Sequence, residues 1–254
     1  MTDTWNPALY DRFKEQRTRP ALDLISLVQY RPLMRVVDLG CGTGEITARL
    51  HDELDAGETI GIDRSAAMLA QAAPRATSKL RFENADIAAY TPLGPVDLLF
   101  SNAALQWVDD HPALLARFRQ WLAPHGQIAI QVPCADRHPS HAVMHKLAEK
   151  YGTGMLYQGH SRVLSAEAYA QKLFDLGFRN QHVVTRVYGH VLGDVDEMVA
   201  FFDSTLLNPW KAALGEAGYV TFRAEYREAL VRELGDHKPM FFPMARTLLW
   251  GQLP

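Results

Sequence analysis

The chain has 254 residues, of which 48% are hydrophobic and 22% charged, the balance of an ordinary globular protein. A formal net charge of −3, without a run of basic residues, argues against a broad nucleic-acid-binding surface. Two cysteines, Cys41 and Cys134, are too few for a disulfide framework, and no apolar run reaches the ~18 residues that a membrane helix needs. The N-terminal stretch carries acidic residues and no apolar core, unlike a signal peptide. We therefore expect a cytoplasmic, single-domain protein without nucleic-acid or membrane partners. The sequence does not determine its oligomeric state, for which a monomer is favoured.

Short apolar runs alternate with segments of helical periodicity in the first half of the chain. Runs typical of strands cover residues 35–39, 59–62, 80–83, 96–101 and 127–132, and amphipathic helices are predicted at 45–54, 65–73 and 112–122. Ser65 stands where the N-cap of its helix belongs. The alternation predicts a parallel sheet with helices on both faces.

The alternation of strand-like and helical segments ends after Pro133. Residues 139–176 and 194–234 are mainly helical in pattern, and a β-rich run at 179–189 separates them. A last β run at 245–252 can pair with it as an antiparallel edge hairpin. We therefore predict one α/β domain over residues 1–254, with a doubly wound, mostly parallel seven-stranded sheet. A helical segment at 1–30 and helical insertions at about 139–176 and 194–240 would cover the ligand pocket.

The stretch VVDLGCGTGEITARL runs from an apolar strand through three glycines into a helix. Gly40 and Gly42 allow the backbone to turn tightly and approach a ligand, and the helix after Gly44 presents free amide hydrogens. A dinucleotide-binding fingerprint would place a third glycine at Glu45, where a carboxylate would instead repel a pyrophosphate. Asp38 adds a second negative charge beside the loop. A ligand with an ammonium or a sulfonium, such as S-adenosylmethionine, fits these charges better than NAD.

Polar residues at the ends of the next strands complete the predicted cofactor site. Asp63 can accept both hydroxyls of a ribose, and Asp86 can accept a hydrogen bond from an adenine amino group. Ser101 and Asn102 end the fourth strand beside the same crevice. The predicted cofactor-binding set is Asp38, Gly40, Cys41, Gly42, Gly44, Asp63, Arg64, Ala85, Asp86, Ile87, Ser101 and Asn102. Cys41 is expected to be a small buried residue, because nothing nearby would stabilise a thiolate.

These motifs resemble a known superfamily. D-x-G-x-G-x-G at residues 38–44, followed by GIDxSxxML, AD and L-x-P-x-G, resembles the class I S-adenosylmethionine-dependent methyltransferases. Beyond that core, WNPALY, QRTRPALDL, NAALQWVDDH, HPSHAVM and LNPW are similar to the trans-aconitate methyltransferase family, and residues 151–163 and 211–240 match it poorly. The resemblance implies a Rossmann-like fold and methyl transfer to a carboxylate of trans-aconitate, which gives a monomethyl ester and S-adenosylhomocysteine.

A tricarboxylate substrate needs cationic partners, and the glycine-loop half of the chain is acidic. The matching groups should come from the family-like segments elsewhere. The candidate substrate-binding residues are Tyr10, Arg17, Arg19, Trp107, His141, Tyr157 and Arg246. Trp107 could face the sulfonium, and for each arginine a solvated surface position is an equal alternative. No catalytic base is expected, because a carboxylate with a pKa near ~4 is already ionised at neutral pH.

Alternative functions remain open at this point. His141 and His145 have the spacing of metal ligands on one helix face, but no Glu follows His141 as in H-E-x-x-H, so no metal site is predicted. The fourth strand does not end in N-P-P-Y or D-P-P-Y, which argues against methylation of a nucleic-acid base. Methylation of another small or carrier-bound carboxylic acid, such as a malonyl carrier, and a non-catalytic S-adenosylmethionine-binding module are the alternatives.

Overall fold

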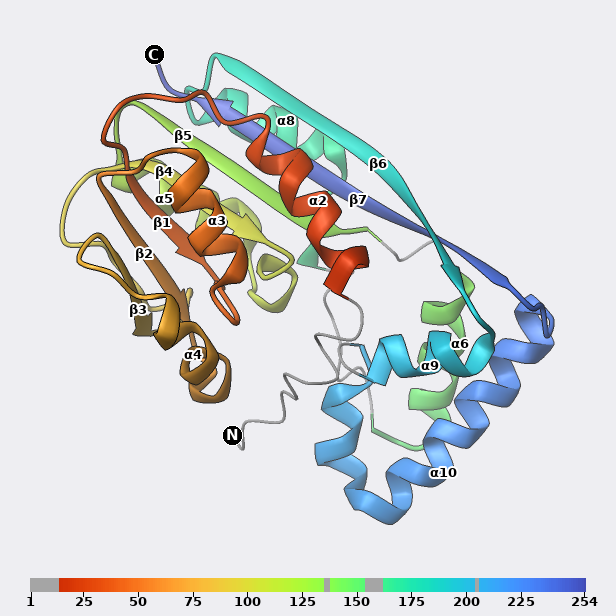
Figure 1. The fold of residues 1–254 in the computed structure, drawn as a ribbon. Coiled ribbons are helices and arrows are strands. Elements are labelled where there is room, and N and C mark those ends of the chain that lie inside the picture. Colours follow the sequence, from red (N-terminus) through yellow and green to blue (C-terminus); the bar gives the residue numbers. More distant parts are fainter. Residues whose placement is uncertain (1–13, 135–137, 154–161, 204–205) are drawn as a thin grey trace.

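The computed structural model describes residues 14–134, 138–153, 162–203 and 206–254. Within them, seven strands form one sheet in the order β3-β2-β1-β4-β5-β7-β6 (Figure 1). The strands are β1 (Arg35–Leu39), β2 (Glu58–Asp63), β3 (Leu80–Asn84), β4 (Val96–Asn102), β5 (Leu122–Pro133), β6 (Asn180–Leu192) and β7 (Met240–Gln252). Neighbours among β1 to β5 are parallel, and β7 is antiparallel to both β5 and β6. The predicted mostly parallel sheet with an antiparallel edge hairpin is confirmed.

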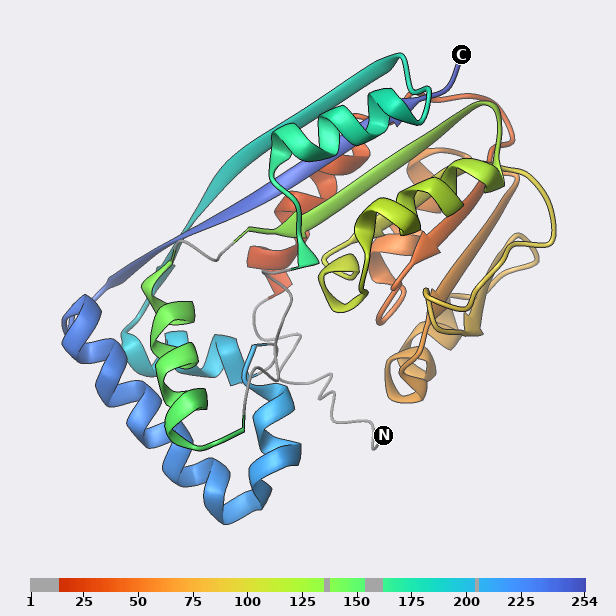
Figure 2. The same cartoon turned by 180° about the vertical axis from the view of Figure 1, so that it is seen from behind.

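Helices cover both faces of this sheet. On one face lie α2 (Lys14–Ile25) and α3 (Glu45–Glu53), and on the other lie α5 (His111–Trp121) and α8 (Ala166–Asp175), as Figures 1 and 2 show from opposite sides. The inner strands β1, β2 and β4 are buried on both faces, which explains their continuous apolar runs, whereas the edge strand β3 is mostly half-buried. Shorter elements are α4 (Ala66–Ala72), η1 (Ala73–Arg75) and η2 (Leu105–Trp107). The Ser65 hydroxyl accepts a hydrogen bond from the Met68 amide at 3.2 Å, so the predicted N-cap of α4 is confirmed.

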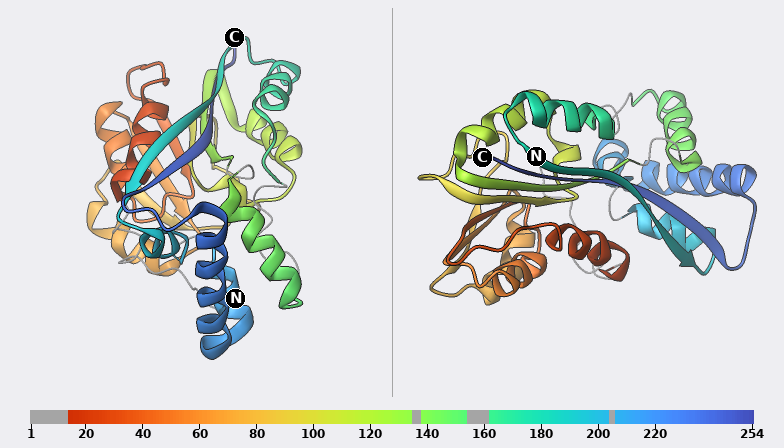
Figure 3. Two further views of the ribbon diagram at one scale, coloured as in Figure 1. Left: turned by 90° about the vertical axis from the view of Figure 1, so that its right-hand side faces the viewer. Right: turned by 90° about the horizontal axis from the view of Figure 1, so that it is seen from above.

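A helical cover, formed by α6 (Pro139–Lys150), α9 (Val195–Asp203) and α10 (Asn208–Leu234), gathers around the far end of the β6–β7 ribbon (Figures 1 and 3). Its core is aromatic, with Phe202, Trp210, Phe222 and Tyr226 all at or below 2% exposure. Phe242 of β7 belongs to the same core. The two outer strands therefore carry the cover and fix its position beside the carboxyl ends of the parallel strands.

The outer ribbon is longer than the sequence pattern predicted. β7 begins at Met240 rather than at residue 245, and β6 continues to Leu192. Pro243 lies inside β7, and a proline usually argues against a central strand. The strand pairing of β5 with β7 ends at Pro133, opposite Arg246, and the Cys134 amide still donates to the Ala245 carbonyl at 3.0 Å. Among the described residues, Pro243 has a strand partner on the β6 side only, so its missing amide hydrogen interrupts no described ladder.

Candidate functional site

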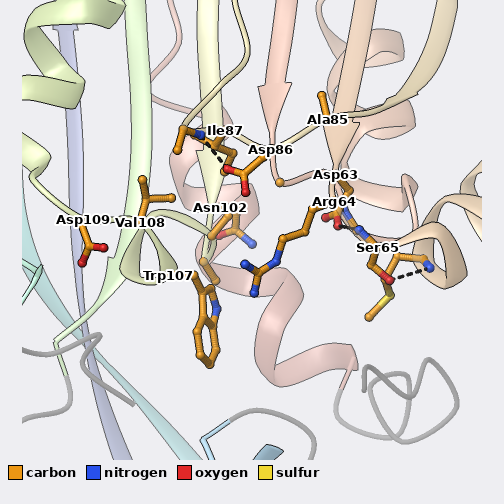
Figure 4. A pocket seen from close by; sticks show the side chains of 16 residues that line it. Asp63, Arg64, Ser65, Ala85, Asp86, Ile87, Asn102, Trp107, Val108 and Asp109 are labelled. Carbon is orange, nitrogen blue, oxygen red and sulfur yellow. Dashed lines mark hydrogen bonds between the residues drawn. The ribbon is translucent and has the colours of Figure 1, made fainter. Parts of the chain in front are cut away.

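A cavity of about 340 Å³ opens at the carboxyl ends of the parallel strands. It lies where the strand order reverses, between β1 and β4, which is the position at which open α/β sheets bind ligands. Most of the predicted cofactor residues line it: Gly40, Gly42, Asp63, Arg64, Ala85, Asp86, Ile87 and Asn102. Trp107, predicted to contact the substrate, lines the same cavity (Figure 4). The structure thus brings together residues that follow four different strands.

The glycine loop leaves room for a ligand at one position and is tightly packed at another. A Cβ atom on Gly40, whose φ is +84°, would lie 2.2 Å from the Cβ of Ala104. A Cβ atom on Gly42, whose φ is +55°, would meet no atom within 4 Å. Gly42 also lines the cavity, so the open space above it faces the ligand site. The loop therefore fits a ligand that approaches the main chain closely.

Asp63 links the loop to the end of β2. Its carboxylate accepts hydrogen bonds from the Gly42 amide at 2.9 Å and from the Ser65 amide at 2.8 Å. A carboxylate oxygen can accept more than one hydrogen bond, so a carboxylate at this position is of the type that accepts the two hydroxyls of a ribose. The same side chain can therefore shape the loop and hold the cofactor's sugar.

The segment after β3 forms the opposite wall of the cavity. The carboxylate of Asp86 is exposed and accepts a hydrogen bond from the Ala88 amide at 2.7 Å. Arg117 of α5 donates to the carbonyl oxygens of Ile87 at 2.6 Å and Ala88 at 2.5 Å. Arg117 therefore positions this wall, although the sequence analysis did not identify it. No local signal could have done so, because about thirty residues separate it from the loop.

Four predicted cofactor residues lie outside the cavity lining: Asp38, Cys41, Gly44 and Ser101. Asp38 is 2% exposed and accepts a hydrogen bond from the Thr47 hydroxyl at 2.6 Å. Burial, together with the charge of Asp63, raises the pKa of Asp38 to about 7. The expectation of a full negative charge from Asp38 beside the ligand is therefore revised.

The other three residues have packing roles. Ser101 is buried and donates to the Leu39 carbonyl at 2.7 Å, which supports the end of β1. A Cβ on Gly44 would collide with the Phe82 ring, so this glycine allows the start of α3 to pack closely. Cys41 is buried, and burial raises the pKa of its thiol, as do the neighbouring carboxylates, so it is no nucleophile.

The sequence analysis also missed several residues that line the cavity. They are Ser65, Met68, Ala88, Ala103, Ala104, Val108 and Asp109. Ser65 and Met68 belong to the GIDRSAAML stretch, and the last four follow β4 directly. Ser65 and Met68 could have been predicted by taking the whole GIDRSAAML stretch as part of the site, and not only Asp63 and Arg64.

The candidate substrate residues are dispersed. Arg246 of β7 is 5% exposed, and its guanidinium donates to the Gln131 amide oxygen at 3.4 Å and to the Met244 sulfur at 2.9 Å. His141 is buried in α6 with its ring edge-on to Phe202.

Four other candidates do not contact the cavity lining or are not described. Arg19 is exposed on α2, away from the cavity lining. Arg17 lies in the same helix, and its side chain is not described. Tyr10 and Tyr157 lie outside the described residues.

Two further features of the described segments bear on the sequence predictions. Among these residues, no group of three or more His, Cys, Asp or Glu side chains is arranged to hold a metal ion. No helix in them has the length and apolar character needed to cross a membrane.

Comparison with known proteins identifies the family. Residues 10–183 match the family model of a methyltransferase domain. The chain belongs to the methyltransferases. A relative from Deinococcus radiodurans named trans-aconitate 2-methyltransferase is 39% identical over 99% of both chains. Another of the same name from Acidovorax ebreus is 36% identical over 94% of this chain and 95% of its own.

Solved structures agree on the fold of this methyltransferase. The YcgJ protein of Bacillus subtilis has a TM-score of 0.61 at 15% identity, covering 93% of this chain and 98% of its own. A phosphoethanolamine N-methyltransferase 2 of Haemonchus contortus, in complex with S-adenosylhomocysteine, has a TM-score of 0.57 at 17% identity, covering 93% of this chain and 53% of its own.

The methyl donor of this enzyme is S-adenosylmethionine, and the cavity suits it. Gly42 leaves the main chain open, the carboxylate-bearing Asp63 lines the cavity, and Asp86 is exposed at the rim. The match to methyltransferases decides against an NAD-dependent oxidoreductase and supports an enzyme over a non-catalytic module.

Proposed function

We propose that the protein methylates one carboxylate of trans-aconitate, which yields a monomethyl ester and S-adenosylhomocysteine. The observation that carries this proposal is near-complete coverage: the Deinococcus radiodurans trans-aconitate 2-methyltransferase aligns over 99% of both chains. The match therefore includes the helical cover and the outer ribbon, the parts that differ most among enzymes built on one fold.

The chemistry requires positioning rather than proton removal. S-adenosylmethionine supplies a methyl group on a positively charged sulfur, which a carboxylate oxygen displaces in line. A carboxylate with a pKa near ~4 is ionised at neutral pH, so the enzyme needs no general base. Holding the oxygen and the methyl carbon in line can lower the barrier by on the order of 7–11 kcal/mol. In this chain, Asp63 and the Asp86 wall would hold the cofactor, and Trp107 would border the reacting groups.

The charge of the substrate must be matched by the protein. trans-Aconitate carries about three negative charges near pH 7, and the cofactor offers a single sulfonium. Arg246 is a buried cation on β7, two strands away from β4 in the sheet. An arginine can hold a carboxylate through two parallel hydrogen bonds. We therefore assign Arg246 to a carboxylate that does not react.

A methyl-transfer screen over di- and tricarboxylates, followed by mass spectrometry, tests the proposal. The expected result is a product 14 mass units heavier than trans-aconitate, formed with the highest kcat/KM of the acids tested. The Gly42→Val variant is the matched control, because its side chain would occupy the open space above the loop. Preference for an uncharged acceptor, or for an acyl carrier protein, would overturn the tricarboxylate assignment.

The proposal includes a cytoplasmic monomer in which the helical cover closes the substrate side of the cavity. Light scattering coupled to size-exclusion chromatography measures the mass, and a dimer would contradict this part of the proposal.

A further inference from the structure

A short turn between β4 and α5 forms one wall of the cofactor cavity. This β4–α5 wall, residues 103–109, contains η2 and five of the lining residues: Ala103, Ala104, Trp107, Val108 and Asp109. Figure 4 shows Val108 and Asp109 across the cavity from Ser65. The start of the wall packs against the glycine loop, since a Cβ atom on Gly40 would lie 2.2 Å from the Cβ of Ala104. The position of the rest of the wall, with Trp107, depends on other contacts.

The backbone of the wall needs such contacts because it is strained near both ends. Ala103 has a φ of +53°, and Asp110, directly after the wall, has a φ of +51°. Residues with a Cβ atom are uncommon in this left-handed region. Strain of this kind persists only where the surrounding structure fixes the backbone, and it is concentrated at functional sites. The groups that hold the wall in place are therefore candidates for a functional role.

His111, the first residue of α5, holds the wall from the protein interior. Its Nε2 atom lies 2.8 Å from the Leu105 carbonyl oxygen of η2, and its Nδ1 atom lies 2.5 Å from the Tyr169 hydroxyl of α8. The same Leu105 carbonyl accepts from the amide of Val108, a lining residue, at 2.9 Å. Both His111 and Tyr169 are 1% exposed, and neither lines the cavity. One imidazole ring therefore joins η2, α5 and α8 behind the cavity surface.

The chemistry of its partners fixes the tautomer of this ring. A carbonyl oxygen only accepts, so Nε2 of His111 must carry the hydrogen and donate it to Leu105. Burial lowers the pKa of His111, so the ring is neutral at pH 7 and Nδ1 has a free lone pair. Burial also raises the pKa of Tyr169, so its hydroxyl stays protonated and donates to Nδ1. The hydrogen bonds therefore run in one direction, from Tyr169 through His111 to the wall.

A second contact reaches the other end of the wall from the same side. Asp109 accepts a hydrogen bond at 2.5 Å from Nε of Arg162, which precedes α8. The Asp109 side chain is 78% exposed, so solvent and salt screen this ion pair, which contributes little. Hydrogen bonds that water does not reach are stronger. The buried chain through His111, and not the exposed ion pair, is therefore the contact that fixes the wall.

We propose that His111 is a positioning residue for methyl transfer: oriented by Tyr169, it fixes the Leu105 carbonyl and thereby the placement of Trp107 against the bound cofactor. His111 does not line the cavity, so it acts through Trp107 and not on the reacting groups. This role goes beyond the proposed function, because the wall borders the cofactor whichever acid accepts the methyl group. Only the turnover measurements rest on trans-aconitate as the acceptor.

Two substitutions at His111 separate the hydrogen bonds of its ring. The amide nitrogen of glutamine reaches the position of the imidazole Nε2, so His111→Gln can still donate to Leu105. Asparagine is shorter and reaches only the Nδ1 position, so His111→Asn loses the bond to Leu105. Tyr169→Phe removes the hydroxyl that orients the ring and keeps the aromatic packing. The control is His51→Leu, which removes a 2.8 Å hydrogen bond to Thr59 outside the cavity lining.

Steady-state kinetics with trans-aconitate and calorimetry with S-adenosylhomocysteine measure the effect of each variant. A displacement of about 1 Å can lower a rate on the order of 100-fold. We therefore expect His111→Asn and Tyr169→Phe to lower kcat at least about tenfold. The Kd for S-adenosylhomocysteine should change less than about threefold, because Asp63 and the Asp86 segment hold the cofactor elsewhere in the cavity. His111→Gln should recover most of the kcat, and His51→Leu should match the wild type.

A double-mutant cycle distinguishes positioning from a general structural defect. If His111 acts through Trp107, then His111→Asn should lower kcat little further once Trp107→Leu is present. A defect spread through the protein would instead lower kcat by the same factor in both backgrounds. If His111→Asn does not fold, Tyr169→Phe carries the same prediction.

Two spectroscopic measurements need no acceptor. Nitrogen-15 NMR of the His111 ring at pH 7 should show the neutral tautomer with its hydrogen on Nε2. The emission of Trp107 in the S-adenosylhomocysteine complex is isolated by subtracting the spectrum of Trp107→Phe in each background. This emission should shift in His111→Asn and return to the wild-type spectrum in His111→Gln.

Three results would overturn the positioning role. They are a wild-type Trp107 emission in His111→Asn, a hydrogen on Nδ1 of His111, and an equal fall in kcat in the presence and absence of Trp107→Leu. If the wild type transfers no methyl group to trans-aconitate, the proposed function fails. The NMR and emission measurements then decide the role of His111 by themselves.

Discussion

Replacing Asp63 with alanine should weaken cofactor binding through a contact that the structure localises. The carboxylate already accepts the Gly42 and Ser65 amides, at 2.9 and 2.8 Å. We expect the same carboxylate to accept the two ribose hydroxyls of the cofactor. A hydrogen bond to a charged group contributes about 1.5–3 kcal/mol, so the loss of the ribose contact alone should raise the Kd about 10- to 100-fold.

The difficulty is to separate the ribose contact from the support that Asp63 gives to the loop. A thermodynamic cycle that changes both the protein and the ligand separates the two effects. Calorimetry would compare S-adenosylhomocysteine with its 2′,3′-dideoxyribose analogue, for the wild type and for Asp63→Ala. Removal of the hydroxyls should cost the wild type most of its affinity and should cost the variant little, because the two changes delete one interaction.

Thermal unfolding without ligand provides the control, since it reports the loss of the contacts that Asp63 makes within the protein, the two amides included. Asp63→Asn should bind with intermediate affinity, because an amide keeps one acceptor oxygen but turns its NH2 group toward an amide hydrogen. If the dideoxy ligand loses the same factor with both proteins, Asp63 does not contact the ribose. Asp63 would then position the glycine loop without contacting the cofactor.

Three further predictions follow from the described contacts. Arg117→Met should raise the KM for S-adenosylmethionine roughly tenfold with a smaller change in kcat, because two hydrogen bonds to the Ile87–Ala88 wall are lost. Arg117→Lys should recover part of the lost affinity. A tenfold fall in kcat with an unchanged KM would contradict the positioning role. The pKa of Asp38 is raised to about 7 in the folded protein, so the folded state retains the proton and stability should fall as pH rises from about 4 to 7 and then level off. Asp38→Asn should lack that decline in urea unfolding, and parallel pH profiles of the two proteins would refute it. Finally, kcat should stay flat from about pH 6 to 9, because the nucleophile is ionised throughout; a steep rise, lost in a histidine variant, would indicate a hydroxyl or amine acceptor.

The fold was largely predictable because its signals are local. Parallel strands buried on both faces appear as short apolar runs, and the helices between them keep a helical period. The outer ribbon was less predictable. Pro243 argues against a strand, and only the described structure shows that β5 stops pairing at Pro133 while β7 continues along β6 past Pro243.

The cofactor site was predictable for a related reason. The carboxyl ends of parallel strands meet at one edge, so residues that follow them converge whatever lies between. The direction of each side chain was not predictable from the motif. Asp38 and Ser101 belong to the right strands, yet one side chain turns toward Thr47 and the other toward the Leu39 carbonyl, behind the cavity wall.

The sequence by itself determined the order of the apolar runs that become strands, the glycine loop, the acid that ends β2 and the acid that follows β3, because each depends on residues close together in the chain. Only the tertiary structure decided which distant residues join them. Arg117 reaches the Ile87–Ala88 wall from α5, and Gln131, Arg246 and His190 share a face because of the register of β5, β7 and β6. That register is set by packing between residues at least 48 positions apart in the chain, which no local pattern records.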